Sequence, residues 1–258
     1  FAFMLPNWEA AVEFSREVVQ GEFGMPAILR ISDPEETERG LALKGFDKGA
    51  ANTFLSKRGF RPWQRCLALG TAEGEKGFAK HVAAQVKRIA RAHGGMSLTA
   101  FAEKQWEHSR YSDSYLREDV LDFGMIIDTL ETSVTWENLH DVHRGVREFV
   151  KARPGTVCMT HASHFYPQGT NLYFIMILKP EDGEDYFAFR DAVVDKIVRC
   201  GGSPSHHHGA GNLFAGWLPG YLGEAEMGVL RALKAHFDPD GIMNPGNTLG
   251  LSPKEKGK

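Results

Sequence analysis

The sequence predicts an α+β fold, in which helices cover one face of a largely antiparallel sheet and a helical segment follows at the C-terminal end. Short apolar runs alternate with segments of helically spaced apolar residues in the order strand–helix–strand, strand–helix–strand, and this order then occurs a second time. It indicates two ferredoxin-like βαββαβ units side by side. No GxGxxG or P-loop motif follows any apolar run, so the chain carries no recognisable dinucleotide or phosphate cradle.

The first unit is expected within residues 1–100. Its first strand leads to Asn7, a suitable N-cap for a helix whose apolar residues recur up to Val19. Asp33-Pro34 begins a short acidic helix, whereas residues 44–64 lose all periodicity and are expected to form a surface loop with some helix. The expected strands are 1–5, 28–31, 66–69 and 97–100, and the expected helices are 8–19, 34–43 and 78–93.

The second unit follows an irregular polar stretch at 103–118. Two strand-like runs flank Pro167-Gln-Gly169 and predict a β-hairpin. A last helix at 221–237 precedes Asp238-Pro-Asp-Gly241, and a charged tail ends the chain. The expected strands are 123–131, 156–164 and 171–178, and the expected core helices are 136–149 and 189–198.

Composition limits the class of protein. The chain has 258 residues, of which 42% are hydrophobic, and this suffices for a packed core in one large domain or two small ones. A net charge of −3 from interspersed acids and bases argues against nucleic-acid binding, and no apolar run is long enough to span a membrane. The three cysteines lack CxxC spacing and indicate reduced core residues of an intracellular protein. Because the chain begins at Phe1, inside an expected strand, it is expected to be the distal part of a longer protein.

The run from Ser205 to Gly211, Ser-His-His-His-Gly-Ala-Gly, is the strongest indication of a chemical site. Imidazole exchanges protons near neutral pH and binds metals, and a Gly-x-Gly lets the backbone approach a ligand closely. In an extended run, His206 and His208 share one face and His207 takes the other. Repulsion between adjacent imidazolium ions keeps at least one ring neutral, so a base is available. The alternative is a polar loop that is simply rich in histidine.

Three other side chains are candidates for the same site. Tyr173 lies in an otherwise apolar strand, where a phenol can relay a proton if a nearby cation lowers its pKa. The alternative is an ordinary core tyrosine with one satisfied hydroxyl. Arg30 and Arg117 offer planar guanidinium donors to a carboxylate or phosphate. The alternative for Arg30 is an ion pair with a nearby acid such as Asp33 or Glu131.

These motifs resemble the C-terminal part of the alkyldihydroxyacetonephosphate synthases (alkylglycerone-phosphate synthases). The triple histidine, with Gly201-Gly202 before it, is the specific part of the resemblance. The Asp-Pro…Asn-Pro-Gly segment that ends at Gly246 is shared more widely by FAD-linked oxidases of the vanillyl-alcohol-oxidase type. Three other segments match in order, namely Pro26–Arg30, Tyr115–Asp119 and Glu131–Trp136.

The resemblance implies a domain organisation and an activity. In that family an N-terminal domain binds FAD and a C-terminal cap lies over the flavin. Residues 1–200 are therefore expected to be an FAD-linked oxidase cap and substrate domain, 201–251 the histidine-motif loop and closing helix of the same domain, and 252–258 a disordered tail. The synthase forms a covalent adduct between flavin N5 and acyl-dihydroxyacetone phosphate, and a fatty alcohol replaces the acyl group to give an ether.

The resemblance also implies roles for individual residues and partners. Catalysis falls to Tyr173, His206, His207 and His208, substrate binding to Arg117 and Arg30, and cofactor contacts to His208, Asn244 and Asn247. The cofactor is FAD, held mainly by an N-terminal domain outside this chain, so the chain alone is expected to be inactive, and no metal is expected. The substrate is a small molecule with a phosphate or carboxylate, nucleic acid is excluded, and the expected location is cytoplasmic. Peripheral contact with membrane lipid and a homodimer are left open.

Two alternative functions are also open. A sister branch oxidises D-lactate, glycolate or 2-hydroxyglutarate, and several of its members hold a divalent metal through a GDGNLH strand and an EHG loop. Here Tyr173 replaces the histidine of that strand and His207 the glutamate of that loop, which disfavours the metal-dependent branch. A metal bound by His161, His164 and the triple histidine would favour it. The other alternative, from a different class, is a ferredoxin-like binding module without a redox role.

Overall fold

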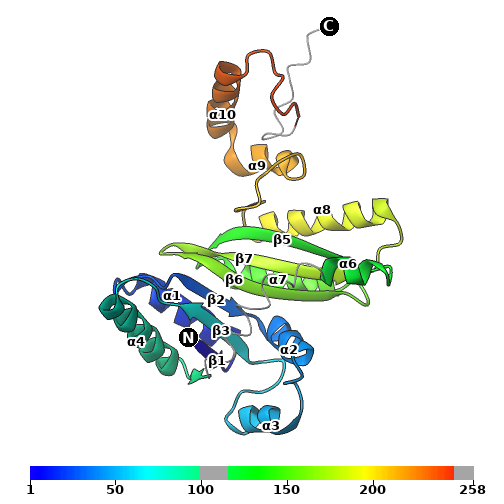
Figure 1. Ribbon diagram of the computed structural model, residues 1–258. Coiled ribbons are helices and arrows are strands. Elements are labelled where there is room, and N and C mark those ends of the chain that lie inside the picture. The colour runs from blue at the N-terminus through cyan, green and yellow to red at the C-terminus, as the bar shows by residue number, and fades with distance from the viewer. Residues whose placement is uncertain (99–115, 247–258) are drawn as a thin grey trace.

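The computed structural model describes residues 1–98 and 116–246 (Figure 1). Its strands are β1 (Ala2–Leu5), β2 (Ile28–Ser32), β3 (Cys66–Thr71), β4 (Met96–Ser97), β5 (Ile126–Thr135), β6 (Val157–Tyr166) and β7 (Gly169–Leu178). Its helices are α1 (Trp8–Gln20), α2 (Pro34–Leu43), α3 (Gly49–Lys57), α4 (Lys76–Ala92), α6 (Leu116–Leu121), α7 (Leu139–Lys151), α8 (Gly183–Arg199), α9 (Leu218–Leu222) and α10 (Glu224–Phe237). A 3₁₀ turn, Ala215–Trp217, precedes α9.

The strands form one seven-stranded sheet in the order β4-β1-β3-β2-β6-β7-β5. Every pair of neighbours in it is antiparallel. The predicted α+β class with a largely antiparallel sheet is therefore confirmed. The predicted hairpin is also confirmed, because β6 and β7 flank the turn at 167–168 and pair with each other.

The first half of the chain completes a βαββαβ unit. Its strands lie in the order β4-β1-β3-β2, and α1 and α4 lie side by side against them (Figure 1). The second half has the order β6-β7-β5 and, among the described residues, no fourth strand. Instead, the chain that leaves α8 follows the edge of β5, where the N–H of Ser203 donates to the carbonyl of Ser133 over 3.0 Å. The triple histidine thus follows a loop at the place where the fourth strand of the second unit would lie.

The two faces of the sheet carry different side chains. Directly opposed residues of antiparallel strands point to the same face, and the next residue along each strand points to the other. Ile31, Ala162 and Leu172 form one opposed row across β2, β6 and β7. They are buried in one continuous core with the apolar faces of α1, α4, α7 and α8. The long helices therefore cover a single face, as predicted, and the alternate residues point to the opposite face.

Two elements extend beyond their predicted bounds. Residues 44–64, predicted as a surface loop with some helix, contain α3, whose Leu55 packs with Phe60 against Met4 and covers part of the face opposite the long helices. β5 continues to Thr135 because it pairs with β7 along its whole length. The sequence pattern does not predict this extension, because its residues are partly polar. They are extended because they pair with β7.

One predicted helix is interrupted, and two other predicted segments lie partly or wholly outside the described residues. The helix predicted at 221–237 breaks at Gly223, whose φ of +85° separates α9 from α10. Only residues 97 and 98 of the predicted strand 97–100 are among the described residues. The predicted tail 252–258 lies wholly outside them. None of the helices in the described ranges combines the length and the apolar character needed to cross a membrane.

The junction between the two halves of the sheet is short and is reinforced by buried charges. β2 and β6 share only two opposed residue pairs, whereas β5 and β7 share ten. Asp33, at the start of α2, accepts hydrogen bonds from Nη1 of Arg147 over 2.5 Å and from Nε2 of His143 over 3.2 Å, both on α7. Glu35 accepts from Nη2 of Arg147 over 2.9 Å and from Nζ of Lys151 over 2.7 Å. These contacts tie α2 of the first half to α7 of the second.

Candidate functional site

A row of polar side chains crosses the face of the sheet opposite the long helices. Glu131 on β5 is directly opposed to Tyr173 on β7, which in turn is directly opposed to His161 on β6. The rings of His161 and Tyr173 stack with their centroids 4.8 Å apart and an interplanar angle of 14°. Because the three residues come from three paired strands, the register of the sheet fixes their spacing.

The triple histidine lies against this row. The ring of Tyr173 is 6.3 Å from that of His207 and 5.4 Å from that of His208, measured between centroids. His206 lies 5.3 Å from His207, and His164 at the end of β6 lies 4.5 Å from His207. The structure therefore brings together the four side chains to which the family resemblance assigns catalysis, although their roles stay predictions.

Glu131 holds the histidine run in place. Its Oε1 accepts the backbone N–H groups of His206, His207 and His208 over 2.6, 2.9 and 3.0 Å, and the hydroxyl of Ser205 over 2.9 Å. Burial raises the pKa of this carboxyl, but the hydrogen bonds from the backbone and from Ser205 outweigh burial and lower it. Glu131 is thus a buried, ionised acceptor around which three successive N–H groups converge.

Two imidazoles at the site have lowered pKa values, those of His206 and His164. Burial lowers the pKa of His206, and the neighbouring His207 and His208 lower it further, against the opposing charge of Glu131. Burial and the adjacent imidazoles likewise lower the pKa of His164. This agrees with the expectation that crowded imidazoles leave an unprotonated base available.

Arg30 lies at the other end of the row and has an acidic partner. Its Nη2 donates to Oε1 of Glu36 over 2.7 Å, and Nδ1 of His161 lies 3.0 Å from the same oxygen. The acid that pairs with Arg30 is therefore Glu36, whereas the sequence had suggested Asp33 or Glu131. Nε of Arg30 and Oε2 of Glu36 are buried without a hydrogen-bond partner in the described structure. Such atoms are rare in native proteins and mark a place where a ligand can supply the missing partner.

We predict that Glu36 makes folding stability depend on pH in the acid range. Burial raises its pKa, but Arg30 and His161 lower it more, to about 2 from an ordinary value of 4.5. A carboxyl with a depressed pKa stabilises the fold above its unfolded pKa, so this contribution is lost as the pH falls from about 4.5 to about 2, and it amounts to roughly 3 kcal/mol. Urea unfolding at several pH values should give a flatter profile for Glu36→Gln. The exposed Glu13→Gln serves as control, and equal slopes for Glu36→Gln and the unmodified chain would contradict the assignment.

Two other predicted residues, Arg117 and Asn244, are not brought to this row. The side chain of Arg117 is exposed on α6, and no contact within the described ranges joins it to Tyr173 or to the triple histidine. Asn244 is exposed after α10, with a φ of +45°, and Figure 1 shows α10 standing away from the sheet. Asn247 lies outside the described residues. Their substrate and cofactor roles stay predictions.

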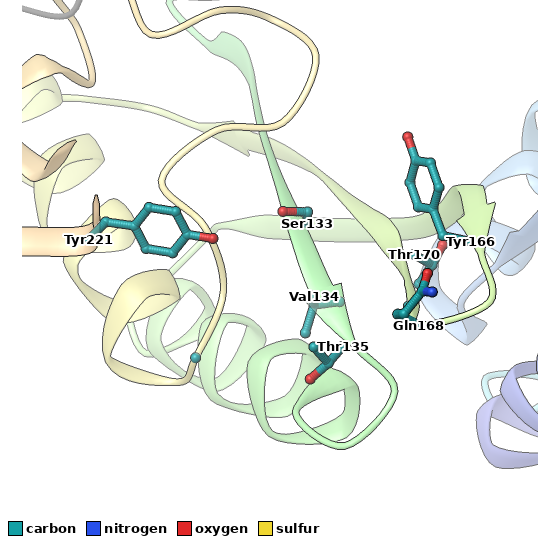
Figure 2. A pocket seen from close by; sticks show the side chains of 9 residues that line it. Ser133, Val134, Thr135, Tyr166, Gln168, Thr170 and Tyr221 are labelled. Carbon is teal, nitrogen blue, oxygen red and sulfur yellow. The ribbon is translucent and has the colours of Figure 1, made fainter. Parts of the chain in front are cut away.

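An open pocket of about 240 Å³ lies at the end of β5 and the turn between β6 and β7. Its lining residues are drawn in Figure 2. Figure 2 shows Tyr221 and Tyr166 on opposite sides of Ser133 and Val134 of β5. Tyr166 connects the pocket to the site, because its hydroxyl lies 3.0 Å from Nε2 of His206. None of the four residues predicted for catalysis lines this pocket, so the row itself is the better candidate for chemistry.

One group of side chains in the described part of the chain has the spacing of a metal site. Donor atoms of Glu131, His206 and His207 all lie within 4.8 Å of one another. The carboxylate, however, is already surrounded by hydrogen-bond donors, since Oε2 accepts from Nδ2 of Asn171 over 2.8 Å and Oε1 accepts from the loop. His161 and His164, which the sequence had offered as ligands, do not belong to this group. The expected absence of a metal stays a prediction.

Two carboxylates of the site had no assigned role in the sequence analysis. The sequence indicates Glu131 only as a possible partner for Arg30, and it does not single out Glu36. Glu131 is the single charged residue in the stretch 129–135 of β5, and a charge inside an otherwise uncharged stretch of strand is the signal that indicates a buried, specifically bonded carboxylate. Glu36 gave no such signal, because acids are common in the first turn of a helix.

Comparison with known proteins places this geometry in a family. A family model described as FAD linked oxidases, C-terminal domain, matches residues 1–248. The chain belongs to this family. The membership confirms the resemblance drawn from the motifs, and it makes the chain a domain of an FAD-linked enzyme family. The domain by itself does not show how FAD is bound.

Several relatives are alkyldihydroxyacetonephosphate synthases. That of Dictyostelium discoideum is 31% identical over 276 residues, which cover 100% of this chain and 45% of the relative, and that of Caenorhabditis elegans is 26% identical over 97% of this chain. An uncharacterised FAD-linked oxidoreductase of Escherichia coli (strain K12) is 30% identical over 74% of this chain and 42% of its own length. The chain thus spans less than half the length of these relatives.

Solved structures agree with the sequence comparison. A structure of an alkyldihydroxyacetonephosphate synthase superposes with a TM-score of 0.71 and 27% identity, over 95% of this chain and 43% of the other. A 4-ethylphenol oxidase from Gulosibacter chungangensis superposes with a TM-score of 0.68 at 12% identity, which shows a shared fold only. D-2-Hydroxyacid dehydrogenases match this FAD-linked oxidase domain only in part, as in 77 residues at 40% identity to D-2-hydroxyglutarate dehydrogenase of Stutzerimonas stutzeri (strain A1501).

Proposed function

We propose that this FAD-linked oxidase domain is the substrate-side cap of an enzyme that makes an alkyl ether of dihydroxyacetone phosphate. The observation that carries the proposal is the convergence of Tyr173 and the triple histidine on one face of the sheet. The identity to alkyldihydroxyacetonephosphate synthases along the whole chain supports it. The chain covers less than half of those relatives, so the activity belongs to a longer protein that also binds FAD.

The described residues fit a cofactor bound over this face from outside the domain. The long helices leave the row uncovered, and the buried Nε of Arg30 and Oε2 of Glu36 lack partners that an overlying ligand can provide. No glycine-rich phosphate cradle occurs in the chain, which agrees with FAD being held mainly by an N-terminal domain. FAD, when bound, supplies the ring at which the exchange of substituents takes place. We assign contacts with it to His208, Asn244 and Asn247.

The proposed exchange is balanced without net oxidation. The bond between a dihydroxyacetone phosphate carbon and the acyl oxygen breaks and a fatty acid leaves, while the oxygen of a fatty alcohol forms a new bond to the same carbon and loses its proton. The phenol of Tyr173 is assigned to move a proton at the reacting carbon, and the imidazoles of the histidine run are assigned to accept the alcohol's proton. Arg30 and Arg117 are assigned to the phosphate, for which a guanidinium provides paired donors.

The alternative is an FAD-dependent D-2-hydroxyacid dehydrogenase. Partial matches to such enzymes and the metal-like spacing of Glu131, His206 and His207 favour it. The identity of residue 173 disfavours it, because a tyrosine stands where that branch has a metal-binding histidine. A non-catalytic binding module is the least favoured function, since the domain family is one of FAD-linked oxidases. A cytoplasmic location, a homodimer and peripheral contact with lipid stay predictions.

The proposal is tested on the full-length protein with an acyl-dihydroxyacetone phosphate and a fatty alcohol labelled at its oxygen. We expect an ether that keeps the labelled oxygen, together with one fatty acid released per ether formed. Reduction of a dye by D-lactate or D-2-hydroxyglutarate, without ether, would replace the proposal by the dehydrogenase. The isolated 258-residue chain is the matched control: it should fold, purify without flavin absorbance and form no ether, and a stoichiometric flavin in it would contradict the assignment of FAD to another domain.

A further inference from the structure

The hydrogen bonds around Glu131 constrain the protons of the histidine run. An ionised carboxylate can only accept hydrogen bonds. Oε2 of Glu131 faces two ring nitrogens, Nδ1 of His207 at 3.2 Å and Nδ1 of His206 at 3.6 Å. We place a proton on the nearer nitrogen, because a carboxylate oxygen at 3.2 Å attracts an N–H group and repels a nitrogen lone pair.

The rest of the network agrees with this placement. Nδ1 of His206 and Nδ1 of His207 lie 3.1 Å apart, so a proton on His207 requires His206 to present a lone pair there. A neutral His206 then carries its proton on Nε2, which lies 3.0 Å from the hydroxyl oxygen of Tyr166 and donates to it. Both ring nitrogens of His206 thereby have a partner.

The same reasoning leaves Nε2 of His207 without a hydrogen-bond partner in the described part of the chain. With its proton on Nδ1, a neutral His207 has its lone pair on Nε2, and within the described residues no hydrogen bond is made to that atom. His207 is also the more exposed of the two rings that face Glu131, with a third of its side chain accessible against 16% for His206. Its free nitrogen is therefore open to a ligand.

We propose that Glu131 is the positioning residue of the site: it binds the loop through three successive N–H groups and fixes His207 as the tautomer whose Nε2 is the free base. Glu131 acts through His207 and contacts no reacting atom itself. The inference rests on the proposed function only in naming the proton that Nε2 accepts, which is that of the incoming alcohol. The arrangement of protons within the chain does not depend on FAD or on substrate.

Glu131→Gln is the variant that separates positioning from mere support of the fold. The amide has the shape of the carboxylate, and its oxygen can still accept the three N–H groups where Oε1 does now. Its NH₂ then replaces Oε2 and donates toward Nδ1 of His207, which must become an acceptor. Asn171 can accommodate the change by turning its amide, because its Oδ1 is buried without a partner.

The measurement is the ring ¹⁵N spectrum of the chain with labelled histidine, in the absence of FAD. The unmodified chain should show the downfield shift of an unprotonated nitrogen at Nε2 of His207, and Glu131→Gln should move that shift to Nδ1. Glu131→Asp, one methylene shorter, keeps the negative acceptor, so the Nδ1–H tautomer should be restored in part. Glu38→Gln is the matched control, since Glu38 is also a buried acid but pairs with Arg65 in the first half of the chain, and it should leave the ring shifts of His207 unchanged.

Two results would overturn the inference. One is an unprotonated Nδ1 of His207 in the unmodified chain, and the other is an unchanged tautomer in a Glu131→Gln chain whose amide spectrum shows a native fold. If Glu131→Gln does not fold, the first result still decides, because it needs no variant. Either outcome would leave the ether-forming assay untouched, whereas a failed assay with the expected tautomer would contradict the proposed function alone.

Discussion

Replacing Tyr173 with phenylalanine in the full-length flavoenzyme should lower kcat by about 10²–10⁴-fold, the usual contribution of a positioned general acid or base. The phenol is the one ionisable group of the row that lies between His161 on one side and the triple histidine on the other. Phenylalanine keeps the ring that stacks on His161 and removes only the hydroxyl. The fold, the flavin content and the KM for the phosphorylated substrate should therefore change little.

Tyr186→Phe is the matched control for this prediction. Tyr186 also has a hydrogen-bonded hydroxyl, which donates to Asp128 over 2.7 Å, but it lies on α8 and takes no part in the row. Its loss should leave kcat within about twofold of the unmodified enzyme while lowering stability by about 1 kcal/mol, the usual value for one hydrogen bond. Turnover by Tyr173→Phe at the same rate as by Tyr186→Phe would remove Tyr173 from the mechanism.

The fold was predictable where the pattern is periodic, and less so where tertiary contacts decide. The amphipathic helix at 139–151 and the hairpin strands could be predicted, because apolar spacing alone indicates them. The end of β5 could not, since Thr132–Thr135 are strand only because β7 pairs with them. The missing fourth strand of the second unit was equally hidden, because residues 201–205 bind the edge of β5 through side-chain and backbone contacts that no periodicity records.

The candidate site was predictable in its residue types but not in its connections. The triple histidine and Tyr173 stand out in the sequence by their chemistry, and the sheet register then places them together. Which acid pairs with Arg30 could not be read from the chain, because Glu36 lies on a helix whose orientation depends on its contacts with α7. Arg117 follows residues that the structure does not describe, and its assignment still depends on the family resemblance.

Asp33→Ala should be the most destabilising single change outside the apolar core, at about 3–5 kcal/mol. Asp33 is completely buried, caps α2 by accepting the N–H of Glu36 over 2.8 Å, and accepts from Arg147 and His143 of α7. Alanine removes the cap and leaves the guanidinium of Arg147 in a buried place with only Glu35 and a backbone carbonyl as partners. Chemical denaturation followed by circular dichroism measures the loss.

Asp33→Asn divides that loss into its two causes. Asparagine is as good an N-cap as aspartate, so this variant keeps the helix start and loses only the charge that faces Arg147. The exposed pair of Asp141 with Arg144 provides a control, and Asp141→Ala should change stability by less than about 1 kcal/mol. Because the two halves of the sheet share only two opposed pairs at β2 and β6, the loss at Asp33 should also separate their unfolding. A single transition with a loss below about 1 kcal/mol in Asp33→Ala would mean that the apolar core, and not the buried charge, joins the halves.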